Sequence, residues 1–408
     1  MKRVVITGLG CITPVGNDVP SFWDSITCGK HGFSKITKFD PELIKVKIAA
    51  EVKDFDPTLY MEKPDIRRTD LYAQYVLAAA AQAVEDSKIA DQIEAKRFGV
   101  YIGSGIGGMN TFVTETEKML TKGPGRISPF FIPMMIANMG SALVAIKYNA
   151  QGPNLPVVTA CSTATHSIGE AFRSIKHGYA DAIIAGGAEA TINPLSMGGF
   201  INCKALSSSD DPDNSSIPFD KRRDGFVMGE GAGIVILEEY EHAKARGAKI
   251  YCEIIGYGNT CDAYHVTAPH PEAVGGAEMI KETFKEANIA PDESLYINPH
   301  GTSTPLNDKT ETLAIKLALG DMAYKVPVSS TKSMTGHMLG AAGGVEAVAA
   351  VKVIETGVIP PTIGYREPDP ECDLDYVPDK MRKAEITAAL SLSLGFGGHN
   401  AGILFKKL

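Results

Sequence analysis

The chain has 408 residues, which is enough for two or three domains, and its 44% apolar and 22% charged residues are ordinary for a globular protein. Its net charge of −8 argues against general nucleic-acid binding, and no apolar run of about 18 residues would span a membrane. Seven cysteines without a C-x-x-C pair favour a reducing, cytoplasmic setting over a disulfide framework, and no signal-peptide pattern is expected at the N-terminus.

Strand-like and helix-like stretches alternate along the chain, which predicts an α/β fold. Buried strands are predicted at residues 3–8, 98–102, 181–185, 250–256 and 294–298. Helices are predicted at residues 71–84, 238–246 and 341–354, and the last is apolar nearly all round and therefore buried.

A glycine-rich motif, G-x-G-x-x-G, follows the predicted strand at residues 98–102. A dinucleotide site would also need an acidic residue at the end of a second strand about 20 residues further on. Gly123 occupies that position, inside a turn. We therefore expect these glycines to allow close backbone packing beside a site rather than to bind a nucleotide.

Cys161 ends an apolar run, and a helical pattern begins directly after it. Apolar residues recur at helical spacing from Ala164 to Ile175, and Gly178 is a plausible stop. The thiol is therefore expected at the N-terminus of a helix. Because that end carries partial positive charge and unpaired N–H groups, it favours the nucleophilic thiolate. The alternative interpretation is a small buried hydrophobic residue.

The second half of the chain repeats features of the first. Aligning Pro156 with Pro327 places Cys161 opposite Lys332. The ends of the two halves also resemble each other, at residues 231–239 and 400–408. We infer an internal duplication, with an N-terminal half at residues 1–250 and a C-terminal half at residues 251–408.

Two histidines of the second half, His300 and His337, stand in loops directly after strand-like runs. The C-terminal ends of strands are where α/β folds place their chemistry. A lone loop histidine is more often structural, but two at strand ends equivalent to that of Cys161 indicate a site. No further His, Cys or carboxylate is suitably spaced to complete a zinc site.

Four motifs stand in order along the chain: Thr-Ala-Cys-Ser at 159–162, Asn-Pro-His-Gly-Thr-Ser-Thr-Pro at 298–305, Ser-Thr-Lys-Ser-Met-Thr-Gly-His at 330–337 and Gly-Phe-Gly-Gly at 395–398. With them the chain resembles the elongating β-ketoacyl-acyl-carrier-protein (ACP) synthases of the thiolase-like superfamily, above all their type II group, over essentially its whole length. The last loop lacks the second cysteine of thiolases, and the Cys-His-His set differs from the Cys-His-Asn set of initiating synthases.

The resemblance implies two duplicated α/β halves in a five-layered α/β/α/β/α arrangement. It also implies an obligate homodimer, whose natural place for strand pairing is the apolar segment 154–159. Pro299 departs from the small residue that usually precedes the first histidine in this family, and it removes a backbone N–H there.

The activity implied is a decarboxylating Claisen condensation in fatty acid elongation. Cys161 would take the acyl chain from acyl-ACP, with the backbone amides of Cys161 and Phe396 binding the oxyanion. His300 and His337 would donate hydrogen bonds to the enolate left when malonyl-ACP loses carbon dioxide. The product would be a β-ketoacyl-ACP two carbons longer. Because loss of carbon dioxide drives the reaction, no metal or redox cofactor is expected.

Lys332 falls on a family position near His337. The resemblance pairs it with acidic groups at Glu346, Asp308 and Glu311, since a buried lysine stays charged only when it is paired. We expect it to set the charge balance of the site rather than to abstract a proton.

The substrate-binding residues also follow from family positions. Thr302 and Thr304 would bind the phosphopantetheine arm, and Ile106 and Phe200 would line the acyl tunnel. Gly395 would give the neighbouring gate residue room to move. Docking of the acidic acyl carrier protein is expected at five basic residues: Lys63, Arg67, Arg68, Arg126 and Lys204.

Alternatives from other classes stay open. A type I elongating synthase or a polyketide-type ketosynthase has the same active-site set. A non-catalytic chain-length factor or decarboxylase-like paralogue would lack the cysteine that this chain has at position 161. A cysteine hydrolase with a Cys-His pair would leave Lys332 and the second histidine unexplained.

Overall fold

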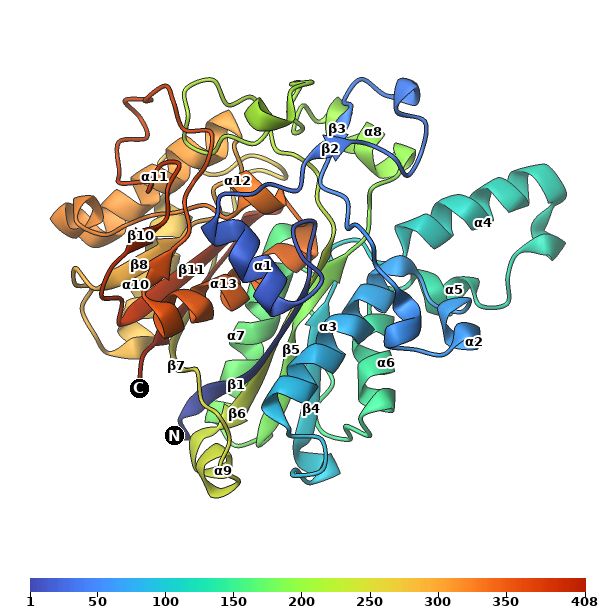
Figure 1. The fold of residues 1–408 in the computed structure, drawn as a ribbon, viewed down its shortest axis with the longest axis horizontal. Coiled ribbons are helices and arrows are strands. Elements are labelled where there is room, and N and C mark those ends of the chain that lie inside the picture. Colours follow the sequence, from blue (N-terminus) through green and yellow to red (C-terminus); the bar gives the residue numbers. More distant parts are fainter.

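The computed structural model describes residues 1–408, and one continuous eight-stranded sheet runs through its centre (Figure 1). The strand order is β4-β5-β6-β1-β7-β12-β11-β8. The eight strands are β1 Val4–Ile12, β4 Phe98–Gly103, β5 Ala182–Glu189, β6 Gly231–Glu239, β7 Cys252–Cys261, β8 Leu295–Asn298, β11 Ala388–Gly395 and β12 His399–Lys406. Four two-residue strands form small separate pairs: β2 Ser34–Lys35 with β3 Ile48–Ala49, and β9 Val358–Ile359 with β10 Arg382–Lys383.

The strand order is mirrored about the contact between β1 and β7. In the first half, β4 and β5 are parallel, and β6 and β1 follow antiparallel. In the second half, β8 and β11 are parallel, and β12 and β7 follow antiparallel. The same pattern in both halves confirms the internal duplication.

The two halves are not separate sheets, because β1 pairs antiparallel with β7 along the register Val4↔Ile254 to Ile6↔Cys252. The largest core cluster, of 40 buried residues, also takes side chains from both halves. The domain boundary near residue 250 therefore stays a prediction, since sheet and core continue across it.

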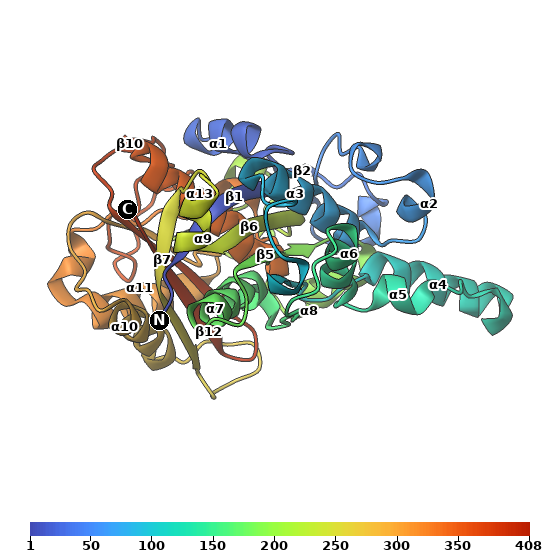
Figure 2. The same cartoon turned by 90° about the horizontal axis from the view of Figure 1, so that it is seen from below.

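The helices supply the remaining layers. α7 (Thr163–Lys176) and α13 (Ala342–Thr356) lie in the middle of the molecule, and each contacts strands of both halves. α3 (Leu71–Ser87) packs on β1 and β6, whereas α10 (Val274–Ala287) packs on β7 and β12 (Figure 2). The order α3, first half-sheet, α7 with α13, second half-sheet, α10 is the α/β/α/β/α layering that was predicted.

The other helices are shorter or peripheral. They are α1 Val19–Thr27, α2 Lys63–Ile66, α4 Met109–Lys122, α5 Phe131–Met135, α6 Met139–Lys147, α8 Pro194–Asn202, α9 Tyr240–Ala245, α11 Pro305–Leu319 and α12 Lys332–Thr335. α4 projects away from the body of the molecule (Figure 1). No helix combines the length and the apolar character that crossing a lipid bilayer requires.

The register of the duplication differs from the sequence alignment. The N–H of Val100 in β4 donates to the carbonyl of Pro153 at 2.9 Å, and the N–H of Ile297 in β8 donates to that of Pro327 at 3.0 Å. Pro327 therefore corresponds to Pro153 and not to Pro156.

Cys161 has a different counterpart as well. It lies in a 3₁₀ turn, Ala160–Ser162, directly before α7, and a matching turn, Leu339–Ala341, directly precedes α13. Both turns begin at a left-handed residue, with φ of 51° at the first and 46° at the second. Cys161 thus corresponds to Gly340, and the alignment with Lys332 was wrong because α12 is an extra helix of the second half.

The apolar run before Cys161 is not a strand in the single chain. Asn154 makes one parallel bridge with Val100, and the residues up to Thr159 have no further ladder partner. Leu155 is 47% exposed and Val158 is 53% exposed. The run lies beside β4 at the end of the sheet, with its outer edge unpaired.

Candidate active site

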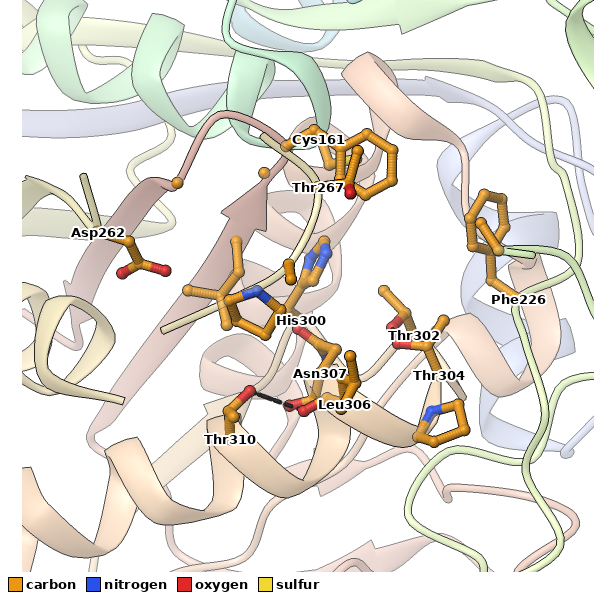
Figure 3. Close-up of a pocket in the computed structure, with 18 of the residues that line it drawn as sticks. Cys161, Phe226, Asp262, Thr267, His300, Thr302, Thr304, Leu306, Asn307 and Thr310 are labelled. Atoms are coloured by element: carbon orange, nitrogen blue, oxygen red, sulfur yellow. Dashed lines mark hydrogen bonds between the residues drawn. The ribbon is translucent and has the colours of Figure 1, made fainter. Parts of the chain in front are cut away.

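A cavity of about 360 Å³ lies where loops of both halves meet (Figure 3). Cys161 from the first half and His300 and His337 from the second half line it. The cysteine sulfur and one ring nitrogen of each histidine lie within 4.8 Å of one another. The structure therefore brings together the three residues that the sequence predicted to be catalytic.

The turn that carries Cys161 is sharply bent. Ala160 is held at φ 51°, a left-handed conformation that costs a non-glycine residue of order 1–3 kcal/mol. The turn closes with a hydrogen bond of 3.1 Å from the N–H of Ser162 to the carbonyl of Thr159. This bend sets the thiol at the cavity wall, just ahead of the first residue of α7.

Burial opposes the thiolate that the sequence predicted. It raises the pKa of Cys161 to about 12, although the charge of Lys332 and the backbone amides of Phe396 and Cys161 act in the opposite direction. At neutral pH the resting nucleophile is therefore a thiol. It has to lose its proton as it attacks, and the ring nitrogen of His337 that lies within 4.8 Å of the sulfur can take it.

Both imidazoles are neutral in this environment. Burial, and after it the positive charge of Lys332, holds the pKa of His300 and of His337 well below the ordinary value. The two rings lie with their centroids 5.2 Å apart and their planes nearly perpendicular. A neutral imidazole carries one N–H, so each ring can donate one hydrogen bond or accept a proton.

Lys332 contacts His300 directly. Its ammonium donates to the backbone carbonyl of His300 at 2.6 Å and lies 3.5 Å from Nδ1 of the same residue. A cation beside Nδ1 favours the tautomer with the proton on Nε2. The carboxylate that balances the charge of Lys332 is that of Glu346, and both side chains are buried.

The expected pairing of Lys332 with Asp308 was wrong. The carboxylate of Asp308 lies 3.7 Å from the guanidinium of Arg223 and accepts a hydrogen bond from the N–H of Phe219 at 2.8 Å. Asp308 belongs to α11 (Pro305–Leu319), and its buried cationic neighbour is Arg223 and not Lys332.

Glu311 acts on the backbone of the histidine loop instead of forming an ion pair. Its carboxylate accepts hydrogen bonds from the N–H groups of His300 at 2.5 Å and Gly301 at 2.7 Å. Pro299 supplies no N–H, so these two amides fix the loop directly after it. The proline that departs from the family pattern therefore leaves His300 in place.

Two backbone amides meet at the thiol. The backbone N–H groups of Phe396 and of Cys161 itself act on the thiol, and both lower its pKa against the effect of burial. Gly395 stands against the nucleophile turn, and a Cβ there would lie 2.9 Å from the carbonyl of Thr159. These amides can bind an oxyanion that forms on a carbonyl carbon attached to the sulfur.

The polar residues predicted to bind the pantetheine arm line the same cavity (Figure 3). Thr302 and Thr304 lie with their hydroxyl oxygens 2.9 Å apart. Phe200 also lines it, with its ring centroid 6.3 Å from that of Phe396. Ile106 does not line this cavity. It packs against the hydrophobic cluster that contains Cys161.

The five predicted docking residues are exposed but not gathered in one place. Lys63 and Arg68 line a groove beside α2, where the guanidinium of Arg68 lies 4.9 Å from the ring centroid of Phe130. Arg67 follows the last residue of α2. Arg126 lies in a 3₁₀ turn after α4, and only Lys204 lines the catalytic cavity.

Glu189, at the end of β5, was not predicted from the sequence. Its buried carboxylate accepts hydrogen bonds from the hydroxyl of Ser104 and from three backbone N–H groups, at 2.9 to 3.2 Å. Two of these amides, of Gly105 and Ile106, belong to the glycine-rich loop, and the third is that of Gly340. The glycine motif was the visible signal, because its tight packing leaves room for a carboxylate and not for Cβ atoms.

Cys161, His300 and His337 are also the three side chains that could offer ligand atoms to a metal ion. The ammonium of Lys332 lies 3.5 Å from Nδ1 of His300, inside the same buried site. A fixed positive charge at that distance opposes a second cation. The site therefore suits a substrate that develops negative charge.

Two family models match the chain: the N-terminal domain of β-ketoacyl synthases over residues 1–243, and the C-terminal domain over residues 251–366. A 3-oxoacyl-[acyl-carrier-protein] synthase 2 from Synechocystis sp. is 52% identical over 408 residues, covering 100% of this chain and 98% of the relative. The enzyme of the same name from Coxiella burnetii is 51% identical, covering 100% and 99%.

A solved structure has the same fold along its whole length. It is a type II polyketide-synthase ketosynthase in complex with its acyl-carrier protein, with a TM-score of 0.90 and 37% identity, and the match covers 100% of this chain and 99% of that one. Matches over the full length, both family models and the assembled Cys-His-His site agree, and the chain belongs to the β-ketoacyl synthase family, with its thiolase-like fold.

Proposed function

We propose that this chain catalyses the decarboxylating condensation of an acyl chain with malonyl-ACP in fatty acid elongation, as a 3-oxoacyl-ACP synthase of the type II elongating group. The observation that carries the proposal is the convergence of a buried thiol, two neutral imidazoles and two backbone amides in one cavity. Relatives named for this reaction, about half identical over the full length, support it.

The first half-reaction moves the acyl chain onto Cys161. The sulfur bonds to the thioester carbon while the thiol proton passes to the unprotonated ring nitrogen of His337, because burial keeps the thiol protonated until attack and Nε2 of His300 already carries a proton. The amides of Cys161 and Phe396 stabilise the oxyanion. The bond to the pantetheine sulfur then breaks, and that sulfur takes the proton from the imidazole as the carrier thiol leaves.

The second half-reaction joins two carbons to the acyl chain. The bond between the malonyl carboxylate and its α-carbon breaks, which releases carbon dioxide and leaves an enolate on the thioester oxygen. The Nε2–H of His300 and, in the tautomer with its proton toward the cavity, the N–H of His337 would stabilise that oxygen. The enolate carbon attacks the acyl-Cys161 carbonyl, the C–S bond breaks, and the sulfur of Cys161 takes up one proton from water, so the half-reaction consumes one proton in all.

The partners and setting of the enzyme belong to the proposal. An acyl carrier protein would deliver both substrates, since the ketosynthase of the complex described above is seen with its own carrier. Two copies of the chain would pair along the exposed apolar run at residues 155–159, which lies at the end of the sheet. We propose a cytoplasmic enzyme whose chemistry uses neither a metal nor a redox cofactor.

Intact-mass measurement tests the proposal directly. Purified protein is mixed with acyl-ACP of several chain lengths, beside Cys161→Ala as the matched control. An acyl adduct on the wild type alone, followed by release of a longer β-ketoacyl-ACP when malonyl-ACP is added, is the expected result. No adduct at any chain length would overturn the synthase assignment and leave a decarboxylase or a binding subunit.

A further inference from the structure

His166 lies outside the catalytic cavity but next to the segment that presents the nucleophile. The side chain is 3% exposed and sits on the first turns of α7. Its Nδ1 is 2.7 Å from the hydroxyl of Thr159, and its Nε2 is 3.1 Å from Oδ1 of Asn259 on β7. One imidazole thus ties the residue that precedes the strained turn to a strand of the other half.

The two contacts fix the protonation of the ring. Asn259 presents a carbonyl oxygen, which can only accept, so Nε2 carries the proton and Nδ1 accepts from the hydroxyl of Thr159. Burial lowers the pKa of His166 to about 4, so the ring is neutral in the physiological range. The hydrogen bond to Thr159 is therefore made whenever the chain is folded near neutral pH.

Thr159 connects the hydrogen bond from His166 to the turn that carries the thiol. Its carbonyl accepts the hydrogen bond that closes the 3₁₀ turn, and its N–H donates to the hydroxyl of Thr163 at 2.9 Å. The next residue is Ala160, whose left-handed φ persists only while its surroundings enforce it. Loss of the hydrogen bond between the Thr159 hydroxyl and His166 would allow the turn to relax and Cys161 to move.

We propose that His166 is a positioning residue for the nucleophile, holding Thr159 so that the strained turn presents Cys161 to the thioester. The proposal rests on the proposed function for its activity readout only. His166 does not line the cavity and takes no part in the proton transfers described above.

Two substitutions at His166 separate the two contacts. In His166→Asn the amide replaces the ring near Nδ1 and can still accept from Thr159. In His166→Gln the amide reaches the place of Nε2 and leaves Thr159 without a partner. Thr159→Val removes the hydroxyl and keeps the shape of the side chain, so it tests the same bond from the other end.

The rate of Cys161 acylation by acyl-ACP is the first readout. We expect His166→Gln and Thr159→Val to slow it about 10- to 100-fold at saturating acyl-ACP with an unchanged KM, because a nucleophile misplaced by about 1 Å loses up to about two orders of magnitude in rate. His166→Asn should stay within about threefold of the wild type. The double variant Thr159→Val/His166→Gln should be no slower than either single variant, since both remove one bond.

Alkylation of Cys161 by iodoacetamide, followed by peptide mass, gives a readout that needs no carrier protein. We expect His166→Gln and Thr159→Val to be alkylated more slowly than the wild type and His166→Asn to be alkylated at nearly the wild-type rate. A wild type that alkylates but never acylates would sink the proposed function and leave the positioning role standing on the alkylation rates. A folded His166→Gln that matches the wild type in both assays, or a His166→Asn as slow as His166→Gln, would overturn the positioning role. If His166→Gln does not fold, Thr159→Val decides by the same criterion.

Discussion

The ammonium of Lys332 donates to the backbone carbonyl of His300 at 2.6 Å and lies 3.5 Å from Nδ1 of that imidazole. The positive charge of Lys332 therefore lies against one of the two imidazoles that have to stay neutral. It adds to burial in holding the pKa of His300 and His337 well below the ordinary value. The buried carboxylate of Glu346 forms an ion pair with Lys332, so the positive charge in the site is balanced.

Replacing Lys332 by Met should move the acid limb of malonyl-ACP decarboxylation to higher pH. Without the cation, the pKa of both histidines rises toward the ordinary value of about 6.5, and the protonated, inactive form is populated at a pH where the wild type is still neutral. The rate of carbon dioxide release between about pH 5.5 and about pH 9 measures the shift.

Stability needs a control here, because Met alone leaves the carboxylate of Glu346 buried and unpaired, at a cost of about 3–5 kcal/mol. The double variant Lys332→Met/Glu346→Gln removes both charges and should recover stability but keep the shifted profile. An unshifted acid limb in the folded double variant would contradict the electrostatic role of Lys332.

The alkylation rate of Cys161 should rise with pH without a plateau below about pH 9, since burial raises its pKa to about 12. Each pH unit then increases the thiolate fraction about tenfold. Site-resolved peptide mass follows Cys161 beside the exposed Cys28, which serves as an internal reference thiol. A plateau near neutral pH would show that the start of α7 and the charge of Lys332 outweigh burial.

Gly395→Ala should lower the turnover number by about two orders of magnitude, because loss of one oxyanion donor costs about 3 kcal/mol. A Cβ at Gly395 would lie 2.9 Å from the carbonyl of Thr159 and 3.0 Å from the hydroxyl of Ser162, so the chain that carries the amide of Phe396 has to shift. Steady-state kinetics with acyl-ACP and malonyl-ACP measure the loss. Gly198→Ala on α8, where a Cβ meets nothing within 4 Å, is the matched control. Equal rates in both variants would remove Phe396 from the oxyanion site.

The local sequence pattern predicted a strand correctly where every residue of the strand is buried. β4 begins at Phe98 as expected, because its apolar run is buried on both faces and bounded by polar residues. Residues 155–159 look the same in sequence, yet form no strand in one chain because their outer edge has no neighbour. A strand needs a partner, and a sequence does not show whether one is present.

Contacts between buried charges are likewise set by the tertiary structure and not by the local sequence. The resemblance predicted Cys161, His300 and His337 as catalytic residues, and the fold brings them together. The resemblance also paired Asp308 with Lys332, whereas Asp308 lies beside Arg223. Which buried charge reaches which carboxylate depends on tertiary placement. Glu189 was not predicted for the same reason, since its carboxylate lies at the end of β5 and the loop that it binds follows β4.

Docking of the carrier protein should depend on the exposed basic residues through charge alone. We expect Lys63→Glu and Arg126→Glu each to raise the KM for acyl-ACP about tenfold, and the effect to shrink as salt is added, because exposed charges are screened within about 10 Å at 0.1 M salt. The turnover number with an acyl-pantetheine thioester that lacks the protein should not change. Lys285→Glu, on the outer helix α10, is the control, since Lys285 is also exposed but lies far from the predicted docking residues. Variants that lose activity equally with the carrier-free substrate would place these residues in folding or catalysis, whereas variants that act only on acyl-ACP would place the acidic carrier against the substituted residues.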